Sequence, residues 1–210
     1  ALDVAQSRVR LASGEFVAYE DLVLATGARP RSIALPGVDL PGVHTLRRIP
    51  DCLALRDAFT AGGRMVIIGA GWIGLEVAAA ARGAGMDVTV LETAGVPLRA
   101  AMGEQLGGYF ARLHERNGVT LRTGIAVEAI EGTDRAEAVL AGGERFAADL
   151  VLVGVGATPN DDLARAAGLA VDNGVLVDDQ LRAAEHVYAA GDVANATNRA
   201  LGTRLRVEHW

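Results

Sequence analysis

Three glycines and one acid form the clearest chemical pattern in the chain. Gly69, Gly71 and Gly74 have the spacing GxGxxG within "VIIGAGWIGLE", directly after an apolar, β-branched run, and Glu92 ends the next apolar run. In such a strand–turn–helix unit, the first glycine permits a tight turn, the second lets a phosphate approach the backbone, and the third lets the helix pack closely on the strand. The N–H groups at the start of the helix then face the phosphates. The pattern predicts a dinucleotide-binding site.

Glu92 makes this prediction more specific than the glycines alone, because glycine turns precede many helices. It follows the loop at the distance of the acid that accepts hydrogen bonds from both adenosine ribose hydroxyls and repels a 2′-phosphate. The alternative interpretation is a solvated acid at the end of a strand. In the company of the three glycines we favour the ribose-binding role, and therefore NAD(H) over NADP(H).

Hydrophobic patterning predicts the elements that would position these residues. We expect strands over 65–69 and 88–91, with a helix over 73–82 between them and an amphipathic helix over 103–117. A buried strand is expected in "LVLVGVG". The segment 28–46 contains three prolines, so we expect an ordered crossover between two domains without regular elements.

Two distant segments resemble each other. "LVLATGARP" and "LVLVGVGATP" both consist of an apolar strand, a glycine turn and a proline shortly afterwards. Two similar nucleotide-binding modules, one inserted in the other, would produce this likeness. Chance similarity between two buried strands is the alternative.

Composition favours a close-packed α/β protein and argues against several other classes. Half of the residues are hydrophobic and only 4% are aromatic, but no apolar run is long enough to span a bilayer. The net charge of −6 argues against broad nucleic-acid binding. Cys52 is the single cysteine, so neither a disulfide nor a thiolate metal cage is expected, and the four histidines lack metal-ligand spacing. The predicted compartment is the reducing cytoplasm.

Four segments together resemble the FAD-dependent pyridine nucleotide oxidoreductases. They are "LVLATGARPR", "VIIGAGWIGLEVAAA…VTVLE", "LVGVGATPN" and "VYAAGDVAN", in that family's order and across nearly the whole chain. Within the family, "GAGWIGLE" and the closing "RVEHW" are most similar to the ferredoxin reductases that serve oxygenases. The resemblance implies a Rossmann-like NAD-binding domain over 45–159, inserted in a partial FAD-binding domain of the same type over 1–44 and 160–210.

The resemblance also implies roles for individual residues. It places Thr26 and Gly27 in a turn that covers part of the FAD, and Asp192 on the ribityl and pyrophosphate side of the FAD. It adds Gly156, in the glycine turn of the third segment, to the cofactor-binding residues.

Two further residues are implied to lie at the reacting centre. Glu76 would lie near the nicotinamide and Trp210 near the flavin, on the path to the electron acceptor. Without the resemblance, Glu76 is an ordinary acid near the start of a helix, where the helix dipole favours negative charge.

The implied activity is hydride transfer from NADH to FAD, followed by transfer of single electrons to a ferredoxin-type iron–sulfur protein. Two alternatives stay open: a related NADH-dependent flavoenzyme with another acceptor (rubredoxin, oxygen or a small molecule), and a non-catalytic NAD(H)-sensing module. The family's first glycine motif is absent from these 210 residues, so we expect a piece of a longer flavoenzyme.

Overall fold

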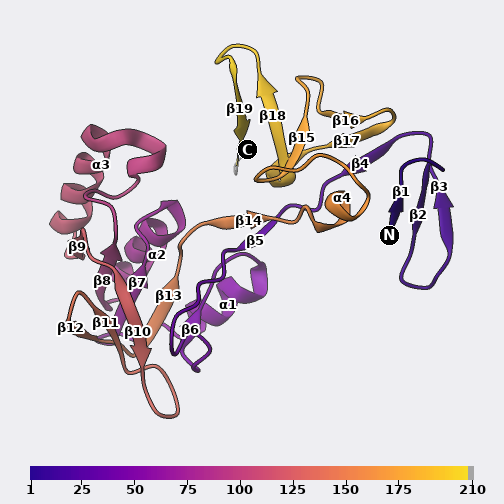
Figure 1. Ribbon diagram of the computed structural model, residues 1–210. Helices are drawn as coiled ribbons and strands as arrows, with labels where there is room; N and C mark the ends of the chain where they lie inside the picture. The colour runs from indigo at the N-terminus through magenta and orange to yellow at the C-terminus, as the bar shows by residue number, and fades with distance from the viewer. Residues whose placement is uncertain (208–210) are drawn as a thin grey trace. The chain divides into compact units, whose positions relative to one another are not determined.

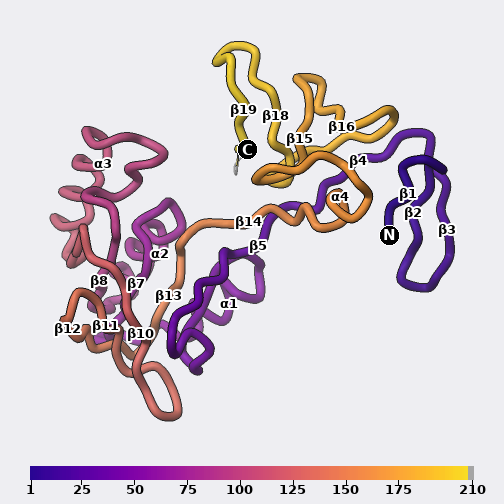
Figure 2. The backbone as a smooth tube through the Cα atoms, viewed as in Figure 1, coloured from indigo at the N-terminus to yellow at the C-terminus, as the bar shows by residue number. Residues whose placement is uncertain are grey.

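A computed structural model describes residues 1–207. The chain forms two compact units, one made of Ala1–Arg29 and the residues from Ala157 onward, the other of Pro30–Gly156. Figure 2 shows this division along the chain, since the indigo start and the yellow end belong to one unit and the middle of the chain forms the other. The chain therefore passes between the units twice, at 29–30 and at 156–157.

The second unit, 30–156, is built on a five-stranded parallel sheet (Figure 1). Its strand order is β6-β13-β7-β8-β9. The strands are β6 (Val43–His44), β13 (Leu150–Val153), β7 (Arg64–Ile68), β8 (Asp87–Glu92) and β9 (Thr120–Thr123). The chain first adds β8 and β9 on one side of β7 and then returns to place β13 on the other side. The strand order thus reverses at β7, and in open α/β sheets ligands bind at such a reversal, outside the carboxyl ends of the strands.

Each face of this sheet is covered by a different layer. On one face lie the helices α1 (Ile49–Asp57), α2 (Trp72–Gly83) and α3 (Arg99–Arg116), and on the other the antiparallel meander β10 (Val127–Glu131), β11 (Ala138–Ala141) and β12 (Glu144–Ala147). Successive side chains of β7 point to opposite faces of the sheet and so contribute to both layers. Met65 and Ile67 join the core beneath the helices, whereas Val66 and Ile68 join the core beneath the meander. All four side chains are almost fully buried, so this strand fixes the unit's centre.

The first unit contains small sheets around a separate apolar core. Its strands are β1 (Leu2–Asp3), β2 (Arg8–Arg10), β3 (Phe16–Ala18), β4 (Leu22–Leu24), β5 (Ala28–Pro30), β14 (Ala157–Pro159), β15 (Val175–Val177), β16 (Arg182–Ala184), β17 (Val187–Ala189), β18 (Ala194–Asn198) and β19 (Thr203–Arg206). A short helix, α4 (Asp162–Ala166), and a 3₁₀ turn, η1 (Gly191–Val193), complete it. The parallel pair of β4 and β17 and the parallel pair of β15 and β18 give this unit its α/β character.

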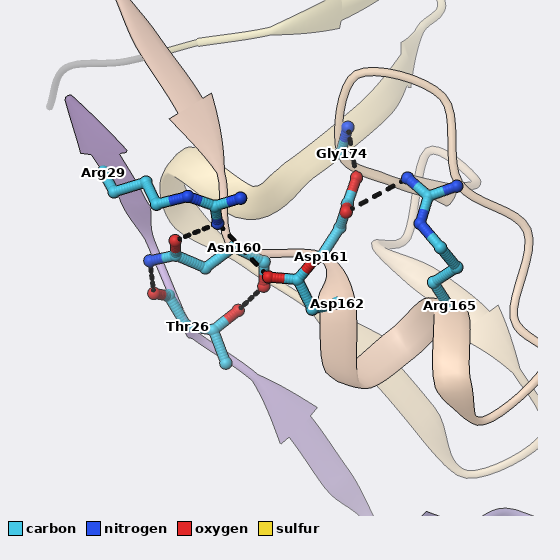
Figure 3. Close-up of polar contacts among 7 residues, drawn as sticks. All are labelled: Thr26, Arg29, Asn160, Asp161, Asp162, Arg165 and Gly174. Carbon is cyan, nitrogen blue, oxygen red and sulfur yellow. Dashed lines mark hydrogen bonds and ion pairs between the residues drawn. The ribbon is translucent and has the colours of Figure 1, made fainter. Parts of the chain in front are cut away.

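The two similar segments of the sequence meet in this unit. Their proline-containing ends form the two-stranded pair β5 and β14. Figure 3 shows the polar contacts beside this pair. The Thr26 hydroxyl donates to the Asn160 carbonyl oxygen (2.7 Å), and the Asn160 side-chain amide donates to the Thr26 carbonyl oxygen (2.8 Å). The Asn160 backbone N–H donates to the Gly27 carbonyl oxygen as well (2.9 Å). The likeness therefore corresponds to two segments that bind each other.

One expectation differs from the structure. The segment 28–46 is not devoid of regular elements, because its ends form β5 and β6, each defined by a distant partner strand that no local pattern reveals. The compact unit itself spans 30–156, and the division into NAD-binding and FAD-binding residues stays a prediction. Residues before 45 join this unit because Ile33, Leu35 and Val38 pack into the core beneath the meander.

An ion pair joins the first residue of β7 to the residue before β13, and it gives a prediction about pH. Asp149 accepts hydrogen bonds from the Arg64 guanidinium (2.7 and 3.0 Å) and from the Arg64 backbone N–H (2.9 Å). These bonds lower the pKa of Asp149 to about 2, below its usual value of about 3.9. Because the folded-state pKa is depressed, the stabilisation is present above pH ~4 and is lost as the pH falls from ~4 to ~2.

We therefore expect the stability difference between the natural chain and Asp149→Asn to shrink as the pH falls from 5 to 2. Both partners are about half exposed, so the difference should be modest even at pH 5. Urea unfolding at several pH values measures it. Asp39→Asn, at an exposed position in the same unit, is the matched control. A difference that stays constant across this range would contradict the prediction.

Candidate nucleotide-binding site

The three glycines of the loop after β7 differ in what a side chain at each position would meet. Gly69 has a φ of +103°, and a Cβ there would lie 2.5 Å from the Gly154 carbonyl oxygen, on the loop after the neighbouring strand β13. Gly74, inside α2, has no space for a Cβ because the Gly69 carbonyl group occupies it. Gly71 is different, since its φ of −77° suits any residue and a Cβ would meet no atom within 4 Å. The fold needs Gly69 and Gly74, whereas Gly71 leaves open space in front of the helix.

The helix that follows presents its amino terminus to that open space. Gly71 is the N-cap of α2 and Trp72 its first residue, and no acidic side chain occupies the first turn. The first N–H groups of a helix have no partner within the helix, and together with the helix dipole they favour an anion. A twelve-residue helix beginning at an unobstructed glycine can therefore receive a phosphate group.

Glu92 lies beside this loop, and its carboxylate is already hydrogen-bonded within the chain. Oε2 accepts from the Ala70 backbone N–H (2.7 Å), and Oε1 accepts from the Ala94 backbone N–H (2.8 Å) and the Thr93 hydroxyl (3.1 Å). A carboxylate offers about four acceptor positions. Three are used, so Glu92 can accept one ribose hydroxyl directly and a second if the Thr93 hydroxyl rotates away.

Two adjoining hollows lie around these residues. The larger, about 470 Å³, is bounded by the residues that end or follow β7, β8 and β13 and by the segments 33–35 and 125–127. The smaller, about 210 Å³, lies between the start of α2 and the segment 94–101. Gly71 and Glu92 line both hollows. The position outside the carboxyl ends of the parallel strands is where this type of sheet binds ligands.

Among the predicted site residues of this unit, the structure brings Gly69, Gly71, Glu92 and Gly156 to the larger hollow. Gly156 has a φ of +102°, which explains the glycine. Glu76 lies on α2 with an exposed side chain and does not line either hollow. Its predicted catalytic role stays a prediction, as does that of Trp210, which lies outside the described residues.

The predicted residues of the first unit lie in two turns. Thr26 and Gly27 form the turn between β4 and β5, where the Thr26 hydroxyl is used by Asn160. Asp192 lies in η1 after Gly191, which has a φ of +72° and open space where a Cβ would stand. The Arg206 guanidinium donates to the backbone carbonyl of Asp192 (3.3 Å) and to that of Ala157 (3.4 Å). A hydrogen bond from Arg206, at the end of β19, therefore holds the turn that carries Asp192 in place.

Sequence reasoning did not single out Asn160, although it stood in the quoted segment "GATPN". Its backbone and side chain bind the Thr26–Gly27 turn, and the Arg29 guanidinium donates to its side-chain oxygen (2.9 Å) and to Asp162 (3.3 Å; Figure 3). Next to it, Asp161 is buried and accepts from Arg165 and from the Gly174 N–H. The likeness between the two segments was the available signal for this contact.

The described residues hold no cluster of three or more His, Cys, Asp or Glu side chains that could bind a metal ion. Cys52 is a free, exposed thiol. Over residues 1–207, every helix is too short or too polar to cross a membrane.

Comparison with known proteins gives consistent matches over the whole chain. A family model described as pyridine nucleotide-disulphide oxidoreductase matches residues 1–210. The chain is 44% identical over 205 residues to the ferredoxin–NAD(+) reductase component of a biphenyl dioxygenase system from Paraburkholderia xenovorans. This alignment covers 97% of the chain and 50% of that protein. It is also 39% identical over 211 residues to a rubredoxin–NAD(+) reductase from Pseudomonas putida. That alignment covers 99% of the chain and 55% of the reductase.

A solved structure agrees with these relatives. The putidaredoxin reductase in a covalent complex with putidaredoxin matches with a TM-score of 0.94 and 36% identity, over 99% of this chain and 52% of that one. The chain thus spans about half the length of the curated relatives it matches.

Proposed function

Because the chain belongs to the pyridine nucleotide-disulphide oxidoreductase family, we propose that it supplies the NADH-binding part of an enzyme that passes electrons from NADH through FAD to a ferredoxin-type iron–sulfur protein. The observation that carries the proposal is the open space at Gly71 on the amino terminus of α2, beside the Glu92 carboxylate. Pyrophosphate would lie on the α2 N–H groups, and the adenosine ribose would lie against Glu92.

The residues of the first unit fit one part of FAD. The Thr26–Gly27 turn and the η1 turn with Asp192 would contact it, and Gly191 leaves the open space that a close approach needs. When bound there, FAD would supply the ability to take up a hydride and give up single electrons, so that NADH and two oxidised ferredoxins would give NAD⁺, a proton and two reduced ferredoxins. The chain's own task is to bind both nucleotides and orient them.

The remaining assignments are part of the same proposal. Residues 45–159 act as the NAD-binding domain, with 1–44 and 160–210 in the FAD-binding domain. Glu76 lies near the nicotinamide and Trp210 near the flavin. We place the activity in the reducing cytoplasm, where a single thiol such as Cys52 stays reduced.

The acceptor is the least constrained part of the proposal. A dioxygenase ferredoxin reductase and a putidaredoxin complex among the similar proteins favour a ferredoxin-type partner. The similar rubredoxin reductase supports rubredoxin as the second candidate. Assays of the natural protein that contains this chain should compare ferredoxin, rubredoxin and oxygen under matched NADH. We expect ferredoxin to give the highest rate, with two molecules reduced per NADH, and an unchanged rate without any protein acceptor would contradict the proposal.

The nucleotide preference can be measured on the 210-residue chain itself. We expect NADH to bind at least about tenfold more tightly than NADPH, a difference of ~1.4 kcal/mol, because the Glu92 carboxylate repels a 2′-phosphate. Calorimetric titration of both nucleotides measures this ratio. Equal affinities would remove the role given to Glu92.

A further inference from the structure

Ala70, in the middle of the glycine loop, has both of its backbone polar groups bonded to the segment that follows β8. Its N–H donates to Glu92 Oε2 (2.7 Å), and its carbonyl oxygen accepts from the Leu98 N–H (3.0 Å). Ala70 is fully buried. Buried backbone groups need partners, and here one segment supplies both of them. We call the two bonds the Ala70 clamp.

The segment that forms the clamp is itself held in place. Glu92 Oε1 accepts the Ala94 N–H (2.8 Å), which turns the chain immediately after the strand. Leu98 has a φ of +54°, an unfavourable conformation for a leucine, yet it is buried and is the N-cap of α3. Gly107 of α3 has no room for a Cβ, because Pro97 and Val96 lie against it. The strained Leu98 conformation is thus fixed by packing, with its N–H bonded to Ala70.

The clamp reaches the phosphate-facing end of α2. Ala70 directly precedes Gly71, the N-cap, whose position decides where the first N–H groups of the helix lie. On the other side, Gly69 donates its N–H to the Leu91 carbonyl oxygen (2.8 Å). The loop is therefore tied to the end of β8 and the residues after it by three bonds, of which one ends on the Glu92 carboxylate.

We infer that Glu92 is a positioning residue for the phosphate-binding loop, in addition to its proposed contact with ribose. The inference rests on the proposed function only for the identity of the ligand. If Glu92 acted on ribose alone, its loss would leave the empty loop unchanged and would not weaken a dinucleotide that lacks the adenosine hydroxyls. If it holds the loop, its loss loosens Ala70 and weakens binding of that dinucleotide too.

The first test needs no nucleotide. Amide hydrogen exchange is compared for the natural chain, Glu92→Ala and Glu92→Gln. In Glu92→Ala we expect the Ala70 and Leu98 amides to exchange at least about tenfold faster. Leu98 is decisive, because its bond does not involve Glu92 and loosens only if the clamp acts as a unit. Gln retains one acceptor oxygen, so Glu92→Gln should restore part of the protection.

A matched control is Glu128→Ala, which removes another carboxylate that accepts a backbone N–H, that of Gly143 (2.9 Å), in the same unit. It should leave the Ala70 and Leu98 amides unchanged. Slow exchange in β7 and β13 of each variant verifies that the unit is folded, and Glu92→Gln decides the test if Glu92→Ala fails to fold. Unchanged Ala70 and Leu98 amides in the folded Glu92 variants would overturn the inference.

The second test uses an NADH analogue with hydrogen in place of both adenosine ribose hydroxyls. We expect Glu92→Ala to weaken its binding about tenfold, although removing a negative charge near the pyrophosphate would by itself strengthen it. Unchanged or tighter binding would overturn the inference. If the natural chain binds neither NADH nor the analogue, the proposed function fails, and the exchange experiment still decides whether the clamp exists.

Discussion

Gly74→Ala is expected to destabilise the 30–156 unit by about 3 kcal/mol, the upper range for forcing an extra methyl group into a packed core. The added Cβ would coincide with the space of the Gly69 carbonyl group and would lie 3.4 Å from Ile67 Cγ2. The Gly69 backbone has little freedom to move, because its N–H is bonded to Leu91 and its Cα faces the Gly154 carbonyl oxygen. Urea unfolding of the chain measures the loss.

The same helix supplies the control for this substitution. Gly83 is the last residue of α2, and a Cβ there would meet no atom within 4 Å. Gly83→Ala should therefore stabilise the helix, by up to about 1 kcal/mol, because alanine is the better helix former. Opposite signs for the two Gly→Ala changes are the expected result. Similar stability of the two variants would contradict the close approach of α2 to the loop after β7.

Much of the 30–156 unit follows from its sequence, because the decisive signals are local. β7, α2 and β8 begin and end within about a residue of the predicted ranges, since buried β-branched runs and a glycine loop mark them. The helix expected from Gly103 begins instead at Arg99 and is interrupted at Gly103, where φ is +73°. Gly103 marks a kink inside the helix and not its start, and the preceding residues 99–102 have no helical pattern of their own in the sequence.

Features that depend on distant partners could not be predicted in the same way. β6 is two residues long and is a strand only because β13 pairs with it. The three prolines of 28–46 predict an irregular crossover, yet the apolar residues of this segment pack into the core beneath the β10–β12 meander. The hydrogen bonds of Ala70 to Glu92 and Leu98 are made by the Ala70 backbone. Every residue type has these backbone groups, so the sequence does not indicate that the bonds form.

Gly71→Ala is expected to separate binding from folding. The backbone at Gly71 is in an extended conformation that any residue adopts, and a Cβ would stand in open space. The free energy of unfolding should therefore fall by no more than about 1 kcal/mol, the cost of replacing an N-cap glycine by the less favourable alanine. The methyl group would, however, stand where a pyrophosphate must approach the first N–H groups of α2. We expect the NADH dissociation constant to rise at least about tenfold, or ~1.4 kcal/mol, and further for Gly71→Val.

Gly95→Ala is the matched control for this binding prediction. Gly95 is exposed on the segment after β8, and a Cβ there would also meet no atom within 4 Å, but Gly95 lines neither hollow. It should keep the natural stability and the natural NADH affinity. Calorimetric titration and urea unfolding of the same samples give both quantities. Natural NADH affinity in Gly71→Ala would show that the phosphate does not approach this glycine, whereas a large loss of stability would show that the fold itself requires it. Only a stable variant with weakened binding agrees with a glycine retained for its ligand.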